Sequence, residues 1–336
     1  MFNHLQSLLL LLALPSTVFS LGTWENLTSI ASGARQEHCV ASINDTVYIV
    51  GGITSSPPNA TGFPPTLSLA EAFSTSSNTW TRVADLPVPM NHCNIASVHG
   101  KLYILGGMNG DTGVWERTGR AFEYCPQNDA WTELPSLPEG TERGASAVGV
   151  SGDKVYIAGG LTVLNFLTEE QDTIATGLVY DTRTKEWSEL PDLPEGRDHV
   201  GGAVVGETFY VVGGRVHGQN NVRGTVFALN LTATEQVWVE KSEMPTPRGG
   251  LAAAATGGKI YTFGGEGDTA LLGPAGVYNN SEVYDTVTDT WEVLAPMAVP
   301  RHGTGATAVA GKVYIPGGGV LKSAGPVDVN DAFVPY

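Results

Sequence analysis

The apolar residues of this chain fall in short runs separated by turn residues, and they do not recur with the 3.6-residue period of a helix. Val200 to Val205 is apolar, Gly206-Glu207 makes a tight turn, and Thr208 to Val212 continues into two glycines. A short turn between two β-rich runs predicts a hairpin. Thr225 to Leu229 and Val237 to Glu240 predict a second one. This segment is therefore predicted to hold four short antiparallel strands.

The same pattern recurs along the chain. The motif Tyr-x-x-Gly-Gly occurs six times, and successive copies stand 51 to 55 residues apart; its tyrosines are Tyr48, Tyr103, Tyr156, Tyr210, Tyr261 and Tyr314. Six of the seven tryptophans precede these tyrosines by 23 to 25 residues: Trp24, Trp80, Trp131, Trp187, Trp238 and Trp291. Four short strands cannot bury both of their faces alone, whereas six such sheets packed radially can. The repeat thus predicts a ring of six sheets.

This repeat resembles the kelch family of β-propellers over residues 21–336. The resemblance implies an all-β, six-bladed kelch-type β-propeller. Trp24 lies in a fourth-strand position with no strands before it, and Asp331 to Tyr336 looks like a third strand with no fourth after it. We therefore expect the N-terminal strand to close the last blade.

Composition narrows the range of partners. The chain has 336 residues, of which 42 are glycine and only 15% are charged, and its formal net charge is −16. Nucleic acids and anionic membranes need clustered Lys and Arg, so neither is an expected partner. We expect a monomer that binds a small molecule or a glycan, with a protein partner as the alternative.

The first twenty residues predict a secretory signal peptide. Leu8 to Leu14 is an almost unbroken apolar run, too short to span a bilayer, and compact residues precede a cleavage point after Ser20. The segment before this run has no Lys or Arg, and an N-terminal strand or a membrane anchor is the alternative. Five Asn-X-Ser/Thr triplets add to the expectation of a secreted glycoprotein: Asn26, Asn44, Asn59, Asn230 and Asn279.

Three cysteines, Cys39, Cys93 and Cys125, leave at least one thiol without a disulfide partner. Their spacing does not suit structural zinc. The sequence favours buried thiols over a framework of bridges, and Cys39–Cys93 is the pair to test.

Long, varied connections between the second and third strands of each unit should share one face of the propeller. They are residues 53–70, 108–120, 161–176, 215–224, 266–280 and 319–328. Because long loops on rigid scaffolds carry function, a pocket is expected on that face, at the mouth of the central channel.

Two sets of repeat positions are candidates for a role at this mouth. Arginine lies thirteen residues before the tyrosine in five units: Arg35, Arg143, Arg197, Arg248 and Arg301; the second unit has Met90. A feature that nearly every blade repeats is predicted to be structural, with a cationic ring for an anionic ligand as the alternative. Eleven residues before the tyrosine the units differ, and Glu37, His92 and His199 stand among small residues. These three are the predicted catalytic residues, since His serves as acid or base near neutral pH; ordinary hydrogen-bonding histidines are the alternative.

The connections add predicted ligand-binding residues. Trp115, the tryptophan outside the repeat, lies close to Asn109 and Asp111 and would stack on a flat ligand or pack beneath its loop. The others follow the fourth and fifth Gly-Gly pairs: Arg215, His217, Glu266 and Asp268.

Kelch propellers include interaction modules, a sialate epimerase class, copper oxidases resembling galactose oxidase, and iron-dependent plant specifier proteins. The copper oxidases need a Cys–Tyr crosslink, and the specifiers carry Glu-x3-Asp-x3-His. Glu195 and His199 are four residues apart, and the Asp of that iron motif is missing. The sequence therefore predicts no metal and no cofactor. It favours a secreted isomerase, epimerase, cyclase or lyase that acts on a carbohydrate or secondary metabolite. A non-catalytic protein- or glycan-binding module is the alternative.

Overall fold

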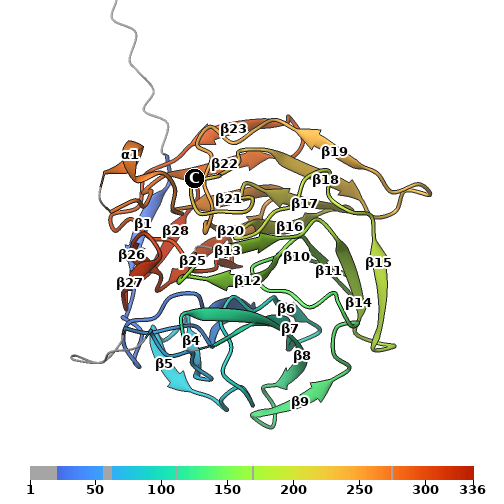
Figure 1. Cartoon of the computed structure of the whole chain (residues 1–336). Helices are drawn as coiled ribbons and strands as arrows, with labels where there is room; N and C mark the ends of the chain where they lie inside the picture. Colours follow the sequence, from blue (N-terminus) through green and yellow to red (C-terminus); the bar gives the residue numbers. More distant parts are fainter. Residues whose placement is uncertain (1–20, 56–62, 111, 169, 274) are drawn as a thin grey trace, which may run out of the picture.

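The computed structural model describes residues 21–55, 63–110, 112–168, 170–273 and 275–336. Six antiparallel sheets stand around a central channel and follow one another in sequence order, as Figure 1 shows. The innermost strands of neighbouring sheets contact one another all the way around, from the first sheet to the sixth and back. The predicted six-bladed propeller is confirmed.

Each blade has four strands, which follow one another from the channel outward. Blade 1 contains β2 (Cys39–Ile43), β3 (Thr46–Val50), β4 (Ala70–Ser74) and β5 (Thr79–Arg82). Blade 2 contains β6 (Ile95–Val98), β7 (Lys101–Asn109), β8 (Val114–Cys125) and β9 (Ala130–Leu134). Blade 3 contains β10 (Ala147–Ser151), β11 (Lys154–Ala158), β14 (Gly177–Asp181) and β15 (Glu186–Leu190). Blade 4 contains β16 (Gly201–Val205), β17 (Thr208–Val212), β18 (Val226–Asn230) and β19 (Trp238–Lys241). Blade 5 contains β20 (Ala252–Thr256), β21 (Lys259–Phe263), β22 (Ser281–Asp285) and β23 (Thr290–Val293). Blade 6 contains β24 (Thr307–Val309), β25 (Lys312–Pro316), β28 (Asn330–Val334) and β1 (Thr23–Asn26).

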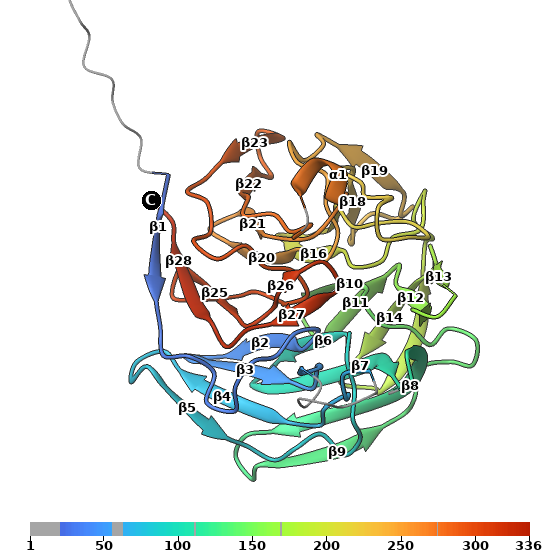
Figure 2. The same cartoon turned by 60° about the vertical axis from the view of Figure 1, so that its left-hand side comes forward.

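The N-terminal strand closes the last blade, as predicted. β1 pairs with β28 antiparallel, with Trp24 opposite Phe333. Figure 2 shows the blue β1 running beside the red β28. The two ends of the described chain therefore hold one sheet together.

Several connections predicted to be loops contain regular structure. β7 and β8 continue past their blade as one long hairpin, so that Trp115 lies on a strand rather than in a loop. The connection in blade 3 forms β12 (Leu161–Asn165) and β13 (Glu170–Thr173), and β12 pairs with the outer part of β8. Blade 6 adds β26 (Gly319–Leu321) and β27 (Ala324–Pro326), and blade 5 adds the helical turn α1 (Thr269–Leu272). The sequence repeat could not show this, because these added strands occur in single blades and are not part of the repeating unit.

The paired glycines allow neighbouring blades to approach closely. Gly51 has φ +67°, and a Cβ there would overlap the carbonyl oxygen of Met90 in blade 2. The next residue, Gly52, donates its N–H to the same oxygen at 2.8 Å. Both positive φ and the close approach require glycine at this place.

The repeated tryptophans also connect blades. Each lies opposite a third-strand residue of its own blade, as Trp131 lies opposite Tyr124. Each indole N–H donates to a backbone carbonyl of the preceding blade, as Trp131 does to Ala84 at 2.8 Å. The other bonds run from Trp24 to Ala295, Trp80 to Thr28, Trp187 to Pro135, Trp238 to Pro191 and Trp291 to Ser242. The tryptophans thus supply an apolar body within the blade and a polar tip between blades.

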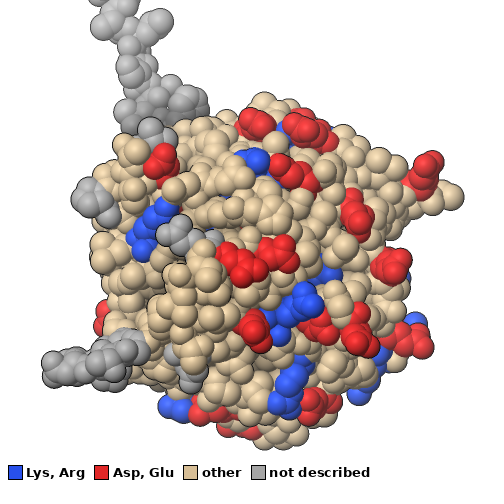
Figure 3. Space-filling view, viewed as in Figure 1, with Lys and Arg blue, Asp and Glu red and all other residues tan. Residues whose placement is uncertain are grey.

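Charges are dispersed over the surface. On the face in Figure 3, the described Lys and Arg side chains are scattered among acidic ones and do not gather into a basic patch. Within the described residues, no helix has the length and apolar character that crossing a bilayer requires.

Candidate functional site

A closed ring of backbone hydrogen bonds surrounds one end of the channel. Its members, which we call the collar, are the residues eleven before each repeat tyrosine: Glu37, His92, Ala145, His199, Gly250 and Gly303. Each N–H donates to the carbonyl of the member in the preceding blade, at 2.6–3.0 Å, and Glu37 closes the circle by donating to Gly303. All six have φ between +48° and +63°. The collar therefore places six side-chain positions at fixed points around the channel.

Three collar side chains converge. The Nε2 atoms of His92 and His199 lie 3.0 Å apart, and the Oε2 atom of Glu37 lies 3.1 Å from Nε2 of His92. Ala145, between the two histidines, and Gly303, beside Glu37, leave the space that these groups fill. A Cβ at Gly303 would overlap the Glu37 carboxylate. The structure thus brings all three predicted catalytic residues together.

Hydrogen bonds at Nδ1 fix how His199 is protonated. Its Nδ1 lies 2.6 Å from Oδ1 of Asp198, a carboxylate buried completely and held in addition by Gln171 and Thr173. A carboxylate accepts, so Nδ1 of His199 carries the proton and donates it. The Nε2 of the neutral ring is consequently an acceptor that faces the other members of the cluster.

A similar chain fixes His92. Its Nδ1 lies 2.6 Å from Oδ1 of Asn91. The amide nitrogen of Asn91 donates to Oγ1 of Thr66, and that hydroxyl donates to the carbonyl of Gly110. Because the amide nitrogen of Asn91 is bonded to Thr66, the amide oxygen is the atom that faces His92. Nδ1 of His92 therefore donates, and its Nε2 accepts.

Charged groups surround the two imidazoles. Arg215 lies between carboxylates: its Nε is 3.3 Å from Asp198 and its Nη1 pairs with Glu266. Its Nη2 lies 3.0 Å from Nε2 of His199. His302 donates from Nε2 to the carbonyl of Leu321, and its Nδ1 lies 3.4 Å from Glu266 without a hydrogen bond.

Burial controls the protonation of this cluster. It lowers the pKa of His92 to about 3, and the charge of Arg215 acts in the same direction. The pKa of His199 is lowered for the same two reasons, against the opposing hydrogen bond to Asp198. Burial would raise the pKa of Glu266, but the charges of His302 and Arg215 outweigh it and hold the pKa at about 2. Both imidazoles are therefore neutral beside an ionised carboxylate.

Open space lies on both sides of the cluster. In the channel, a cavity of about 240 Å³ is lined by the collar and the first residues of the innermost strands. On the loop side, Trp115, Phe166 and Gln219 leave only a narrow gap above the histidines. Beyond it, a pocket of about 600 Å³ lies between the β12–β13 ribbon and the connections of blades 4 and 6, with Gln171 and His217 in its wall.

Comparison with known proteins identifies the family. Residues 144–334 match the KLHDC2/KLHL20/DRC7 kelch-repeats domain, and residues 34–87 and 89–138 match the kelch motif. The chain is 39% identical over 330 residues to the Kelch-like protein terF of Aspergillus terreus, which covers 96% of this chain and 70% of that protein. The chain belongs to the kelch family.

Other kelch proteins are more distant. The chain is 28% identical over 239 residues to Kelch-like protein 41a of Danio rerio, which covers 70% of this chain and 37% of that protein. It is 25% identical over 255 residues to human Kelch-like protein 15, with 71% and 40% covered. It thus spans less than half of either vertebrate relative. The solved structure of YjhT matches with a TM-score of 0.73 and 17% identity, over 90% of this chain and 95% of that one, which shows a common fold.

The repeated arginines of this kelch propeller lie inside the blades. All five are at most 1% exposed and donate to backbone carbonyls, as Arg248 does to Gly264 at 2.6 Å. The others donate to Leu69 (Arg35), Thr176 (Arg143), Gly196 (Arg197) and Ile315 (Arg301). Buried in this way, none can form a cationic ring open to a ligand. The geometry agrees with the structural role that the repetition predicts.

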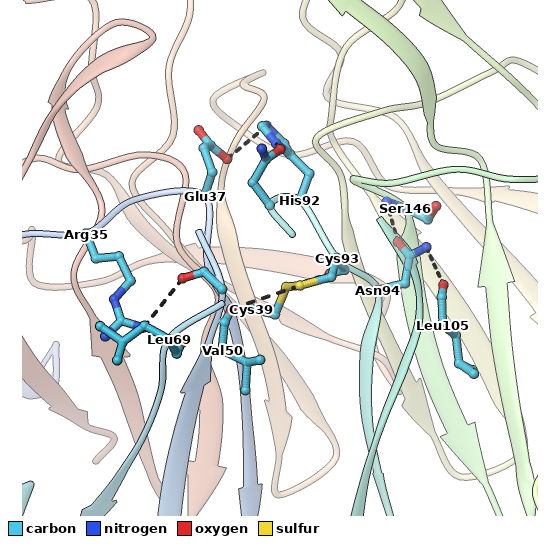
Figure 4. Close-up of a disulfide and its surroundings, with 12 residues drawn as sticks. Arg35, Glu37, Cys39, Val50, Leu69, His92, Cys93, Asn94, Leu105 and Ser146 are labelled. Atoms are coloured by element: carbon cyan, nitrogen blue, oxygen red, sulfur yellow. Dashed lines mark hydrogen bonds and ion pairs between the residues drawn. A yellow bond between two sulfur atoms is a disulfide. The ribbon is translucent and has the colours of Figure 1, made fainter. Parts of the chain in front are cut away.

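A disulfide joins Cys39 and Cys93. The expectation of buried thiols is wrong for this pair, whereas Cys125 is a free cysteine. Figure 4 shows the disulfide directly beneath Glu37 and His92, whose side chains point toward each other. The bridge links blades 1 and 2 next to the collar residues that each contributes.

The predicted ligand-binding residues have different environments. Trp115 is 3% exposed, packs edge-to-face on Phe166 and lies 5.9 Å from the ring of His92, so it covers the cluster instead of offering a free stacking face. Arg215 and Glu266 are buried in the cluster. Three other candidates lie away from it: Asn109 and His217 are exposed, and Asp268 caps α1. Asp111, the sequon at Asn59 and the predicted signal peptide lie outside the described residues.

The residues that orient the histidines were not predicted from the sequence. Asn91 and Asp198 each immediately precede a collar histidine, and the same register holds Gln36 and His302 in other blades. Asp198 forms an isolated β-bridge with Arg215, as Gly249 does with Glu266. Polar residues recur one position before the collar in several blades, and this repeat is visible in the sequence. Polar residues at such positions are also common in ordinary turns, so the repeat alone does not indicate a site.

Proposed function

We propose that this kelch protein is a secreted enzyme that binds a small molecule in the channel cavity and rearranges it by isomerisation, cyclisation or elimination. A carbohydrate or a secondary metabolite is the substrate class. The observation that carries the proposal is the convergence of Glu37, His92 and His199 on the collar, next to a cavity of about 240 Å³.

Backbone conformation supports a functional reason for these side chains. A φ near +50° costs a non-glycine residue on the order of 1–2 kcal/mol, and blades 5 and 6 use glycine at the same point. A collar needed only for architecture would be more stable with glycine throughout. Strained residues of this kind are concentrated at functional sites. The three polar side chains therefore remain for what they do in the channel.

The surroundings suit chemistry at a substrate held in the cavity. Asp198 and Asn91 keep both rings in one tautomer, with Nε2 toward the cluster. Glu37 adds a carboxylate oxygen at the same place. Three acceptor atoms beside one cavity can take a proton from a bound substrate, return it at another atom, or hold the group that does so. Isomerisation, cyclisation and elimination all need such a transfer and no net redox change.

Exposure of the predicted glycosylation sites supports secretion. Asn26, Asn44, Asn230 and Asn279 are all exposed, as an attached glycan requires. The disulfide also suits an oxidising compartment. Intact mass of the protein from its natural host, before and after removal of N-glycans, tests this part of the proposal. A mass equal to that of the chain from Met1 onward, with no glycan attached, would contradict secretion.

The test of activity begins with the metabolites of the source organism, profiled with and without this gene. We expect a compound that accumulates without the gene to be converted by the purified protein, to an isomer in a rearrangement or to a smaller product in an elimination. Glu37→Gln and His199→Ala should lower the rate at least ~100-fold, in line with the loss of an acid–base group. His99→Ala, at an exposed surface histidine, is the control and should leave it unchanged.

The alternative is a binding module that uses the pocket on the loop side. That pocket is wide, and it presents Phe166 beside amide side chains and the exposed His217. Unchanged metabolites, together with a protein or glycan whose capture is lost in His217→Ala and retained in Glu37→Gln, would replace the enzyme with this function.

A further inference from the structure

The cluster on the collar brings three acceptor atoms together, and a single N–H, that of Arg215, is directed at one of them. Nδ1 of His92 donates to Asn91 and Nδ1 of His199 donates to Asp198, so both Nε2 atoms are acceptors, only 3.0 Å apart. The nearby Oε2 of Glu37 is an acceptor as well. Acceptors at such distances repel each other unless a cation lies among them.

We propose that Glu37, His92 and His199 bind one divalent transition-metal ion, through Oε2 and the two Nε2 atoms. These atoms all lie within 4.8 Å of one another, and two of the three separations are close to the roughly 3.3 Å expected between ligands in a tetrahedral zinc site. Two imidazoles and a carboxylate suit zinc, iron, cobalt or nickel better than magnesium or calcium. Three protein ligands leave a coordination position open, as catalytic metal sites do, and the channel cavity adjoins it.

The outer hydrogen bonds match those of metal-binding histidines. Such a histidine donates its second N–H to a carboxylate, carbonyl or similar acceptor, which fixes the ring and raises its basicity. Asp198 plays that part for His199, and Asn91 plays it for His92. Asn91 is itself held by Thr66, so that its oxygen stays toward the ring.

Charge also favours a dication. Three carboxylates, from Glu37, Asp198 and Glu266, surround the site. Among the described residues they are faced by Arg215 and by Nδ1 of His302, which lies 3.4 Å from Glu266 and 3.7 Å from Glu37. The carboxylates outnumber these cationic groups in a buried region, and a metal ion would reduce the imbalance.

Arg215 opposes binding and must give up one contact. Its Nη2 lies 3.0 Å from Nε2 of His199, where it donates to the lone pair that the metal needs. Its guanidinium is a rigid plane whose Nε and Nη1 bind Asp198 and Glu266, so the whole group must shift against these carboxylates to free His199. Metal binding therefore costs one hydrogen bond and a small displacement of two ion pairs.

This inference deepens the proposed function, because it concerns the same site. A bound metal would polarise an oxygen of the substrate and lower the pKa of a water on the open position. The two proposals can fail separately. A protein that converts its substrate but binds no metal would overturn the metal site alone. One that binds the metal and converts nothing would overturn the enzyme alone.

The experiment uses the purified protein, treated with a chelator and dialysed. Zinc is titrated by calorimetry, and cobalt is added as a spectroscopic probe. We expect one equivalent of zinc to bind, the melting temperature to rise with zinc, and cobalt to give visible absorption of low-coordinate Co²⁺. His92→Ala and His199→Ala should each weaken zinc binding by more than the roughly 10- to 100-fold that loss of an outer partner causes. Asn91→Leu, which removes such an outer partner, should weaken zinc binding by roughly 10- to 100-fold.

Two controls keep the result interpretable. His217→Ala and His99→Ala remove exposed histidines outside the cluster and should bind zinc as the unmodified protein does. Thermal unfolding of every metal-free variant shows whether it folds, and Glu37→Gln provides a variant of unchanged size. Absence of stoichiometric binding to the unmodified protein would overturn the site. So would binding that folded His92→Ala and His199→Ala retain in full.

Discussion

One residue in each blade holds a left-handed backbone conformation so that the collar can close. Glycine does this in two blades, alanine in one, and larger side chains in three. The energetic consequence is local: each non-glycine member is less stable than a glycine would be, while its N–H and C=O remain bonded around the ring. Stability and side-chain chemistry therefore oppose each other at these positions.

Ala145 tests this trade-off, because its methyl group has no part in the polar cluster. Ala145→Gly should raise the free energy of unfolding by up to about 1 kcal/mol, since relief of the left-handed penalty exceeds the added freedom of the unfolded chain. Urea denaturation measures it. Ala147→Gly, at a buried extended position in β10, is the control and should lower stability. A loss of stability in Ala145→Gly would show that packing of its methyl group against the cluster around Trp115 outweighs the backbone penalty.

The buried arginines give a second prediction at this scale. Arg248 pairs with Glu282, and both are completely buried. Arg248→Met should cost about 3–5 kcal/mol in the free energy of unfolding, because it removes the partner of a buried carboxylate. Blade 2 has an apolar pair in place of this ion pair: Met90 stands at the position of the arginine, Phe122 stands at that of the glutamate, and the two pack together. The double variant Arg248→Met/Glu282→Phe should recover most of the loss in chemical denaturation. If the single and double variants were equally unstable, the arginine would matter through its backbone contacts and not through the pair.

Between elements, the disulfide is the covalent link that joins two blades beside the site. It ties the first residue of β2 to the residue after His92, across 54 positions of sequence. Closing a loop of this length is worth about 4 kcal/mol in the chain-entropy model. Cys39→Ser/Cys93→Ser should therefore lower the free energy of unfolding by about 2–4 kcal/mol in denaturant titration. It should also lower zinc affinity, because Glu37 and His92 lose a common anchor.

Cys125→Ser is the matched control for that pair, since Cys125 is free and lies outside the collar. It should leave both quantities unchanged. If the double serine variant matched the unmodified protein in stability and in metal affinity, the disulfide would have no part in holding the two blades.

At the scale of the whole molecule, ring closure depends on the strand that begins the described chain. Trp24 packs edge-to-face on Phe333 and Phe263 and donates to Ala295, so it joins both ends of the chain to blade 5. Trp24→Ala should lower the free energy of unfolding by about 3 kcal/mol. It should also speed hydrogen exchange in β28, whose outer partner is β1. Trp187→Ala removes the equivalent side chain in blade 3, whose strands all come from residues 147–190, and should leave exchange in β28 unchanged. Equal exchange of β28 in the two variants would contradict a special role for closure.

The fold could be predicted because its contacts repeat. Five of the six blades pair only strands from one stretch of the sequence, and every unit repeats the same tyrosine, glycines and tryptophan at nearly the same step. The site could be predicted only in part. Alignment of the units singled out Glu37, His92 and His199, but not that the histidines meet across Ala145. Their partners Asn91 and Asp198 look like turn residues until the blades are placed around one axis. The ribbons β12–β13 and β26–β27 were missed because they belong to no repeat.

The collar has a consequence for how such a protein changes its chemistry. Its hydrogen bonds use backbone atoms alone, so the ring closes whichever side chains it carries. Ala145 and Gly250 are two places where a new reactive group would face the same channel, held to the same axis by bonds already present. An activity can thus be altered one substitution at a time, with no blade redesigned. In evolutionary terms, substitutions on the collar can change the chemistry of the channel while the fold stays the same.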